Sequence, residues 1–384
     1  MIFRTVMFIV ALSLSICGPA LAQGSASPRP ADVRLAKGVN LSHWFAQSLE
    51  GYDAQRLSSF VTEVDAQLLR RAGFTHVRLP VAMDRAFAAG ADGKAFVSTL
   101  AQKISMLNDA GLVVVVDIHA SVDEKRALLD PARQKAFVEG WRSLAGTLAR
   151  LKPDLVIFEL LNEPYPLVGA QWWPLQNRAI QAIRTVASRN TLMVNPGDWS
   201  GIDDYTSEFA AVRDSNVIYT AHVYQPLLFT HQGADWVWEV AAQVAGVEWP
   251  LDPAVAAEVA AQAGSTEEAV KQLTYQISER QFEAGWLSNL FDKLTRWQQQ
   301  HGGVPVYIGE FGVYRPLAPT SARLRWHKET REAFEAHGWG WAVWDYAGGF
   351  GIVQSDSEPA HRILDRSMLE ALGLPAPVKT GERN

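Results

Sequence analysis

The sequence predicts a closed (β/α)8 barrel that forms a single domain. Eight short apolar segments alternate along the chain with longer amphipathic stretches, which is the order of elements in a parallel sheet connected by helices. Several of the apolar segments lack the polar alternation of a half-exposed strand, so we expect both of their faces to be covered. An open doubly wound sheet is the main alternative. However, no glycine-rich phosphate turn follows the first segment, which favours the barrel.

The elements follow from the spacing of apolar residues. Val, Ile and Leu are the commonest residues of the expected strands, which are 33–40, 76–81, 112–119, 155–163, 192–196, 217–224, 304–310 and 340–345. Apolar residues at helical spacing, with Gly or Asn near several ends, predict helices over 65–72, 95–110, 131–151, 171–188, 266–300 and 321–337. Segment 225–250 is too long for an ordinary loop, and we favour a wall of a substrate cleft for it over the alternative of packing around the barrel rim.

The first 22 residues have the features of a secretory signal. Arg4 precedes an apolar run, and Ala20-Leu-Ala22 forms a small-x-small cleavage site. We therefore expect export to the periplasm or the exterior. The only cysteine, Cys17, lies inside this segment, so the processed chain would form no disulfide.

The rest of the chain divides into three parts. Residues 23–32 are rich in Ser and Pro and predict a flexible tail, residues 33–375 predict the barrel, and residues 376–384 predict a C-terminal tail.

Charge and hydropathy exclude several classes of partner. The formal net charge is −6, and acidic and basic residues are interspersed without a basic run, which argues against nucleic-acid binding. After the signal, no apolar stretch approaches the ~20 residues of a membrane span. We expect a soluble monomer whose substrate is neutral or is not selected by bulk charge.

Two glutamates suggest the chemistry. Glu163 and Glu310 each stand where an apolar strand ends, and the carboxyl ends of barrel strands form the rim where substrates bind. A buried glutamate costs free energy, so two of them at one rim indicate function. A pair of carboxyl groups is the equipment with which most glycosidases cleave a glycosidic bond.

Other polar and aromatic residues cluster at the same ends of the expected strands. Core packing alone does not predict this coincidence. In chain order these candidates are Asn40, His43, Trp44, Arg78, His119, Asn162, Trp199, His222, Tyr224 and Trp344. Trp236, in segment 225–250, is a further candidate for stacking on a sugar ring.

Seven sequence pieces in register resemble glycoside hydrolase family 5, the former cellulase family A. They are Gly38-Val-Asn-Leu-Ser-His-Trp44, His76-Val-Arg-Leu-Pro80, Asp117-Ile-His119, Leu161-Asn-Glu-Pro164, His222-Val-Tyr224, Ile308-Gly-Glu-Phe-Gly312 and Trp344. The resemblance covers most of the chain and implies a retaining glycosidase.

The resemblance implies roles for individual residues. Glu163 is similar to the family's acid/base and Glu310 to its nucleophile, with Arg78 and Tyr224 near the latter. Because Glu163 would stand beside a second carboxylate, we expect it to be hard to ionise. Asn162 resembles the residue that holds the sugar 2-hydroxyl.

The alternation of strand side chains bears on these roles. Strict alternation would point Asn162 and Glu163 to opposite faces, so both can line the site only if the strand end twists or bulges. Glu159 shares the parity of Glu163, and we expect it to be hydrogen-bonded inside the barrel.

The resemblance also implies what the remaining candidates do. Trp344 is similar to the tryptophan that floors the subsite on the non-reducing side of the scissile bond, and His119 and His222 to neutral hydrogen-bonding residues near it. A metal site is the alternative for the two histidines, but no His-x-His pair or acidic cluster accompanies them. We expect no metal and no cofactor.

The sequence thus predicts a retaining β-glycoside hydrolase, most cellulase-like, that cleaves a β-linked polysaccharide or oligosaccharide as an endo-β-1,4-glucanase. A β-1,3- or β-1,6-glucanase, a mannanase or a transglycosylase would share its motifs. A carbohydrate-binding barrel without catalysis is a more distant alternative, because such a module needs no acid/base pair.

Overall fold

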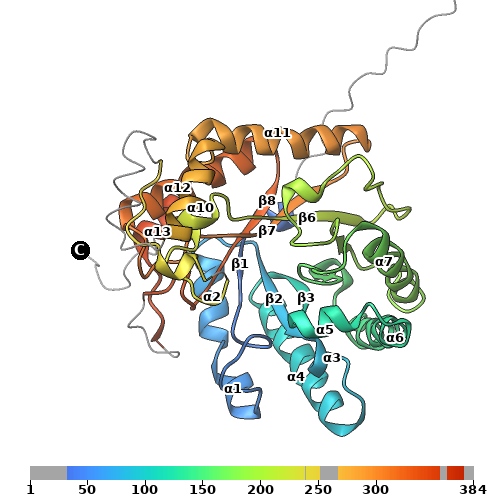
Figure 1. The fold of residues 1–384 in the computed structure, drawn as a ribbon. Coiled ribbons are helices and arrows are strands. Elements are labelled where there is room, and N and C mark those ends of the chain that lie inside the picture. Colours follow the sequence, from blue (N-terminus) through green and yellow to red (C-terminus); the bar gives the residue numbers. More distant parts are fainter. Residues whose placement is uncertain (1–32, 238, 251–266, 355–360, 376–384) are drawn as a thin grey trace, which may run out of the picture.

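Eight parallel strands close into a barrel with helices around its outside, in a computed structural model that describes residues 33–237, 239–250, 267–354 and 361–375 (Figure 1). Each strand pairs with the next in sequence, and β1 pairs with β8. The fold prediction is therefore confirmed. The predicted signal and both predicted tails lie outside the described residues.

All the strands except β2 are shorter than the sequence suggested. They are β1 Lys37–Asn40, β2 His76–Ala82, β3 Val113–His119, β4 Val156–Glu159, β5 Leu192–Val194, β6 Val217–Val223, β7 Val306–Phe311 and β8 Gly340–Val343. Expected strand 155–163 ends at Glu159, so Asn162 and Glu163 lie in the loop that follows β4.

Helices follow or precede the strands around the barrel. They are α1 Ala54–Ser59, α2 Glu63–Arg71, α3 Met83–Ala86, α4 Gly90–Asp109, α5 Val122–Ala127, α6 Pro131–Leu148, α7 Gly169–Arg184, α8 Leu227–Thr230, α10 Glu267–Ser278, α11 Ala284–Gln300, α12 Thr320–Ala336 and α13 Arg366–Ala371. Short 3-10 turns are η1 Val33–Leu35, η2 Pro153–Leu155, η3 Ile202–Asp204 and η4 Ala241–Gln243.

The single helix expected over 266–300 is wrong, because the chain forms two helices there. Arg280 adopts a left-handed φ of 61°, which ends the helical path after α10, and its guanidinium pairs with Glu283 at 2.6 Å. Phe282, between them, is buried in the core. The break lets this aromatic ring pack inward before α11 begins.

Alternation along the strands builds the barrel interior in layers. Inward residues near the start of the strands, such as Val115, Ile157 and Ile218, form an apolar cluster separate from the core under the helices. Two residues further along β3 and β4 stand Asp117 and Glu159. The interior therefore changes from apolar to charged toward the carboxyl ends of the strands, where barrel enzymes carry their sites.

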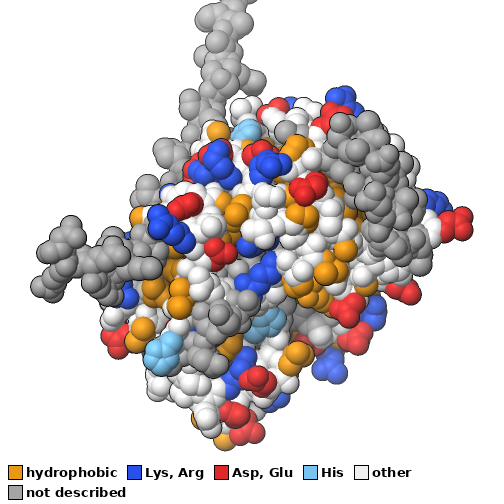
Figure 2. Space-filling model, turned by 90° about the vertical axis from the view of Figure 1, so that its left-hand side faces the viewer, with side chains coloured by type: hydrophobic (Ala, Val, Ile, Leu, Met, Phe, Trp, Pro, Cys, Tyr) orange, Lys and Arg blue, Asp and Glu red, His pale blue; other side chains and the backbone are white. Residues whose placement is uncertain are grey.

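Segment 225–250 packs largely around the rim. Phe229, Gln232 and Trp249 are fully buried, whereas Trp236 is 58% exposed. On the face drawn in Figure 2, Lys and Arg side chains are interspersed with Asp and Glu side chains. Apolar and uncharged polar surface lies between them. Among the described residues, no helix has both the length and the apolar character needed to cross a membrane.

Candidate active site

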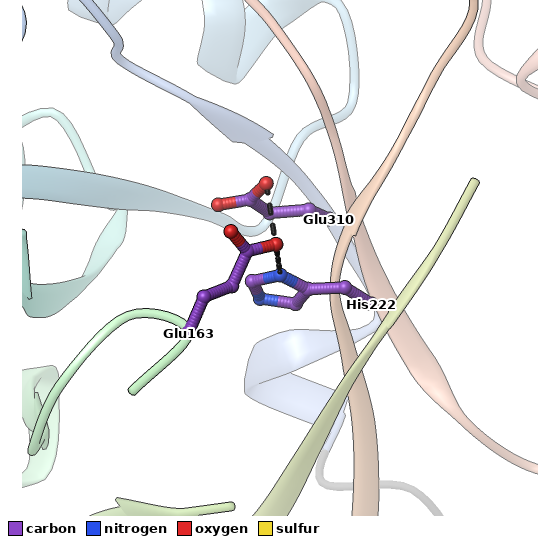
Figure 3. A group of neighbouring side chains, drawn as sticks. All are labelled: Glu163, His222 and Glu310. Atoms are coloured by element: carbon purple, nitrogen blue, oxygen red, sulfur yellow. Dashed lines mark hydrogen bonds and ion pairs between the residues drawn. The ribbon is translucent and has the colours of Figure 1, made fainter. Parts of the chain in front are cut away.

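Glu163 and Glu310 face each other across the mouth of the barrel (Figure 3). One carboxylate oxygen of each lies within 4.8 Å of the other and of a ring nitrogen of His222. Carboxyl groups of retaining glycosidases are ~5 Å apart, whereas those of inverting enzymes are separated by ~6.5–9.5 Å to admit a water. The separation therefore fits a double displacement through a covalent intermediate.

A bulge in β7 turns Glu310 into the site. Ala221 of β6 pairs with Ile308, but the next residue, His222, pairs with Glu310, so Gly309 is an extra residue in β7. Tyr307 belongs to the inner cluster, and strict alternation from it would send Glu310 outward. A side chain on Gly309 would lie 2.7 Å from the Thr220 hydroxyl oxygen, so only glycine fits this position.

Glu163 reaches the site through a change in backbone conformation after β4. Its φ of 40° is left-handed, which breaks the alternation after β4. Asn162 can therefore contact Arg78 and His119 while Glu163 contacts His222. Both residues therefore line the site, because the backbone after β4 departs from strict alternation, as the sequence required.

Glu310 is held by donors on both oxygens. Arg78 Nη1 donates to Oε1 at 2.7 Å, and the Tyr224 hydroxyl donates to Oε2 at 2.9 Å. Burial, together with the charges of Glu310 and Glu163, raises the pKa of the Tyr224 hydroxyl, which keeps it a donor. The carboxylate is thus fixed in one orientation.

Arg78 is fully buried and connects the polar layer of the barrel. Its Nε and Nη2 donate to Glu159 at 2.7 and 2.9 Å, which confirms the expected internal role of Glu159. Nη1 also donates to Asn40 at 3.0 Å and Nη2 to Asn162 at 2.9 Å, and Nη2 lies 3.1 Å from Asp117. With Glu310 included, the guanidinium of Arg78 therefore contacts five polar side chains.

The protonation expected for Glu163 is reversed in the free site. Burial has the largest single effect and raises its pKa, but the hydrogen bond and charge of His222, with the charges of Lys125 and His119, lower it further than burial raises it. Burial likewise lowers the pKa of His222, yet the carboxylates of Glu310 and Glu163 raise it overall. His222 Nδ1 lies 2.9 Å from Glu163 Oε1, and the shared proton rests on the imidazole side.

His119 is neutral, and its neighbours fix its tautomer. Burial lowers its pKa to about 3. Nδ1 donates to Asp117, whose oxygen is 3.0 Å away, and Nε2 accepts from the Asn162 amide at 3.3 Å. The Trp344 ring lies nearly parallel to the imidazole, with centroids 6.2 Å apart and planes at 21°. This arrangement fixes Asn162 and Trp344 relative to the imidazole of His119.

The candidates from the first strand separate in the structure. Trp44 is fully buried and its indole N–H donates to the Leu57 carbonyl at 3.0 Å, so its prediction as a sugar-stacking residue is wrong. The sequence could not separate it from its neighbour His43, whose side chain is 41% exposed and lies 3.7 Å from Asp345. Asn40 is buried, and besides accepting from Arg78 it donates to the Gly309 carbonyl at 3.0 Å.

Two exposed aromatic pairs lie on loops beyond the strands. Trp199 is 50% exposed and stacks on Tyr165, with centroids 4.5 Å apart and planes at 14°. The Tyr165 N–H also donates to the Asp198 carbonyl at 2.9 Å, which joins the loops after β4 and β5. Trp236 packs edge-on against Tyr314 at 4.7 Å. Neither tyrosine was among the predicted site residues, although Tyr165 follows Glu163 by only two residues.

The spacing of Glu163, His222 and Glu310 could also suit a metal ion. Their contacts argue against one, because His222 Nδ1 is already bound to Glu163 and a fully buried guanidinium stands 2.7 Å from Glu310. A divalent cation would be repelled by Arg78 and would have to break both contacts. The donor set therefore fits proton transfer better than metal binding.

The chain is similar to known proteins over most of its length. Endoglucanase C of Acetivibrio thermocellus is 27% identical over 351 residues, covering 86% of this chain and 97% of that protein. Endoglucanase 3 of Fibrobacter succinogenes is 28% identical over 84% of this chain, which spans only about half, 51%, of that protein. Cel5A of Thermotoga maritima, solved with cellobiose, has a TM-score of 0.70 at 24% identity over 88% of this chain and 97% of its own.

The family model described as Cellulase (glycosyl hydrolase family 5) matches residues 38–349. This range takes in nearly the whole barrel and both glutamates, at a separation suited to retaining cleavage. The chain therefore belongs to the cellulase family, glycosyl hydrolase family 5.

Proposed function

We propose that this protein hydrolyses β-1,4-linked glucan as a retaining endoglucanase. The observation that carries the proposal is the pair of carboxylates within 4.8 Å of each other at the carboxyl ends of β4 and β7. Endoglucanases are prominent among its relatives in the family. Relatives named for 1,3-β-glucosidase or mannosidase activity align over only 52% and 50% of this chain, so those alternatives are not favoured.

In the first step, the Glu310 carboxylate attacks the anomeric carbon while the bond to the leaving oxygen breaks. Arg78 and Tyr224 hold both oxygens of Glu310, so the attacking atom is positioned before substrate arrives. The leaving oxygen takes its proton from the pair formed by Glu163 and His222. Glu163 faces the substrate, and His222 resupplies the proton through the 2.9 Å contact.

In the second step, Glu163 accepts a proton from water, and the resulting hydroxide attacks the anomeric carbon. The ester bond to Glu310 breaks and the sugar leaves with its original configuration. Asn162 stands between Arg78 and His119, where it can hold the 2-hydroxyl of the sugar. Two inversions thus give net retention.

The test is the stereochemistry of the first product. We expect proton NMR to show the β-anomer released first from cellopentaose, and Glu310→Gln to lose at least ~10⁴-fold in kcat without loss of fold. First release of the α-anomer would contradict a double displacement. Absence of hydrolysis of cello-oligosaccharides and mixed-linkage β-glucan would contradict the substrate proposal.

Export and oligomeric state belong to the same proposal. We infer that residues 1–22 direct export and are removed, and that the enzyme acts as a monomer in the periplasm or outside the cell. Mass spectrometry of protein recovered from the cell envelope should find a chain beginning at Gln23. A chain that retains Met1 would contradict export by cleavage.

A further inference from the structure

Helix α5 buries a lysine and exposes a valine. The helix begins three residues after the strand end at His119. On it, Lys125 is only 4% exposed, while Val122 is 40% exposed. An ordinary surface helix shows the opposite pattern, because burying an ammonium group costs free energy and burying a valine yields it. The position of Lys125 therefore requires a compensating role.

The ammonium of Lys125 has no direct partner in the part of the chain that the structure describes. None of these residues gives it a side-chain hydrogen bond, and none provides a carboxylate within ion-pair distance. A lysine carries three donors and no acceptor, so all three remain free for a ligand. A lysine residue more than nine-tenths buried is unusual unless something completes its ammonium group.

The charges around Lys125 belong to the catalytic centre. Burial lowers its pKa most strongly, and the carboxylates that oppose burial are, in order, Glu163, Asp117, Glu310 and Glu124. In turn, the charge of Lys125 contributes to lowering the pKa values of Glu163 and His119. The buried side of α5 therefore faces the site, on the side of Glu163.

We propose that Lys125 is a substrate-binding residue whose ammonium group donates hydrogen bonds to a hydroxyl of the glucan unit held beside Glu163. The proposal rests on the function proposed above. Four carboxylates surround the centre, against the cations Arg78 and Lys125 and the protonated His222, so an anionic sugar substituent would be repelled. The carboxylates are those of Asp117, Glu159, Glu163 and Glu310. A neutral hydroxyl satisfies the donors without that cost.

The experiment compares Lys125→Met, which keeps the side-chain length but removes the donors, with Lys103→Met. Lys103 is also a partly buried lysine, but it lies on α4 and its ammonium donates to the Ser58 carbonyl at 2.8 Å. We expect Lys125→Met to lower kcat/KM on cellotetraose by roughly 10- to 100-fold, the range for a hydrogen bond to a charged group, with unchanged or higher thermal stability. Lys103→Met should retain wild-type kcat/KM.

Binding is measured separately, in a Glu310→Gln background that does not turn over. Calorimetry should show that Lys125→Met weakens the binding of cellotetraose at least about tenfold, at every pH from 5 to 8. Lys125→Arg, which keeps charge and donors, should recover part of the affinity. Unchanged affinity, with a loss of kcat that a change of pH restores, would overturn the proposal and leave Lys125 acting only through Glu163.

Three further outcomes are decisive. If Lys125→Met lost activity on carboxymethylated β-glucan but not on neutral cellotetraose, the ligand would be an anion and the proposal would be wrong. If wild-type protein hydrolysed no β-glucan, the proposed function would fail. If wild-type protein is active and Lys125→Met equals it in both kcat/KM and affinity, only the inference about Lys125 fails.

Discussion

Glu163 Oε1 lies 2.9 Å from His222 Nδ1, and the two residues shift each other's proton affinity in opposite directions. The pKa of Glu163 is lowered and that of His222 is raised, so the free site holds its proton on the histidine side of the contact. Once substrate displaces water and the leaving oxygen becomes basic, the proton has a short path through Glu163. In the proposed mechanism, the pair therefore acts as one acid.

This pairing predicts a pH window for stability. Below the ordinary His pKa of 6.5 the contribution of His222 is fully present, and it is lost as pH rises through its raised folded pKa. Above the ordinary Glu pKa of 4.5 the contribution of Glu163 is fully present, and it is lost as pH falls through its lowered folded pKa. In urea unfolding, the free energy of unfolding of the wild type should therefore exceed that of Glu163→Gln most clearly between pH 4.5 and 6.5. The difference there should be roughly 1.5–3 kcal/mol.

The exposed Glu139 provides the control. Glu139→Gln should remain within about 0.5 kcal/mol of wild type at each pH. A difference between wild type and Glu163→Gln that stayed flat from pH 3 to 9 would show that the pair has no linked proton.

Arg78 should be essential to the fold as well as to the site. Arg78→Met leaves the buried carboxylates of Asp117, Glu159 and Glu310 without their cation, at a cost of ~3–5 kcal/mol. Arg126→Met, which removes an exposed pairing with Asp123, should cost less than about 1 kcal/mol. Calorimetric melting of both variants checks this; equal melting temperatures would contradict the central position given to Arg78.

Gly309 should be the glycine to which activity is most sensitive. In Gly309→Ala the new carbon would lie 2.7 Å from the Thr220 hydroxyl and 3.3 Å from His222 Nε2. We expect the imidazole to move and kcat to fall by ~10²-fold, because small misplacements of reacting groups are costly. Gly285→Ala on α11, where nothing lies within 4 Å, should keep full activity and gain about 0.4–1 kcal/mol of stability.

Trp199 and Trp44 should fail in different ways. Trp199→Ala removes a half-exposed ring, so KM for cellopentaose should rise roughly 5- to 10-fold at unchanged melting temperature. Trp44→Phe alters a fully buried ring and loses its bond to the Leu57 carbonyl, so stability should fall by about 1–3 kcal/mol while KM stays constant. Steady-state kinetics and melting curves of both variants check this. A loss of stability in Trp199→Ala, or a raised KM in Trp44→Phe, would contradict these roles.

Much of the architecture could be predicted because it depends on local regularities. Apolar strands such as β3, with Val113 to Val116 in succession, are unambiguous in the sequence. The break between α10 and α11 was not predictable, because the helical periodicity continues past Arg280 and only the packing of Phe282 decides it. Tertiary burial prevailed there over local propensity.

Within the site, the alternation of side chains along the strands was informative up to the last residues of each strand. It placed Glu159 inside the barrel, where it accepts a hydrogen bond from Arg78. It could not place Glu310, which depends on the bulge at Gly309, although an isolated glycine in a strand is a signal for a bulge. It could not foresee that His222 would outweigh the neighbouring carboxylate in its effect on Glu163, because that balance depends on a 2.9 Å contact.

The most direct test of the account is to identify the residue that carries the covalent intermediate. The protein is incubated with an activated 2-deoxy-2-fluorocellobioside, and intact mass and peptide mapping are recorded for wild type and Glu310→Gln. A double displacement through Glu310 predicts one sugar per chain, attached to Glu310 and absent from the variant. An adduct on Glu163 or another residue, or no adduct in a preparation that hydrolyses cellopentaose, would contradict it.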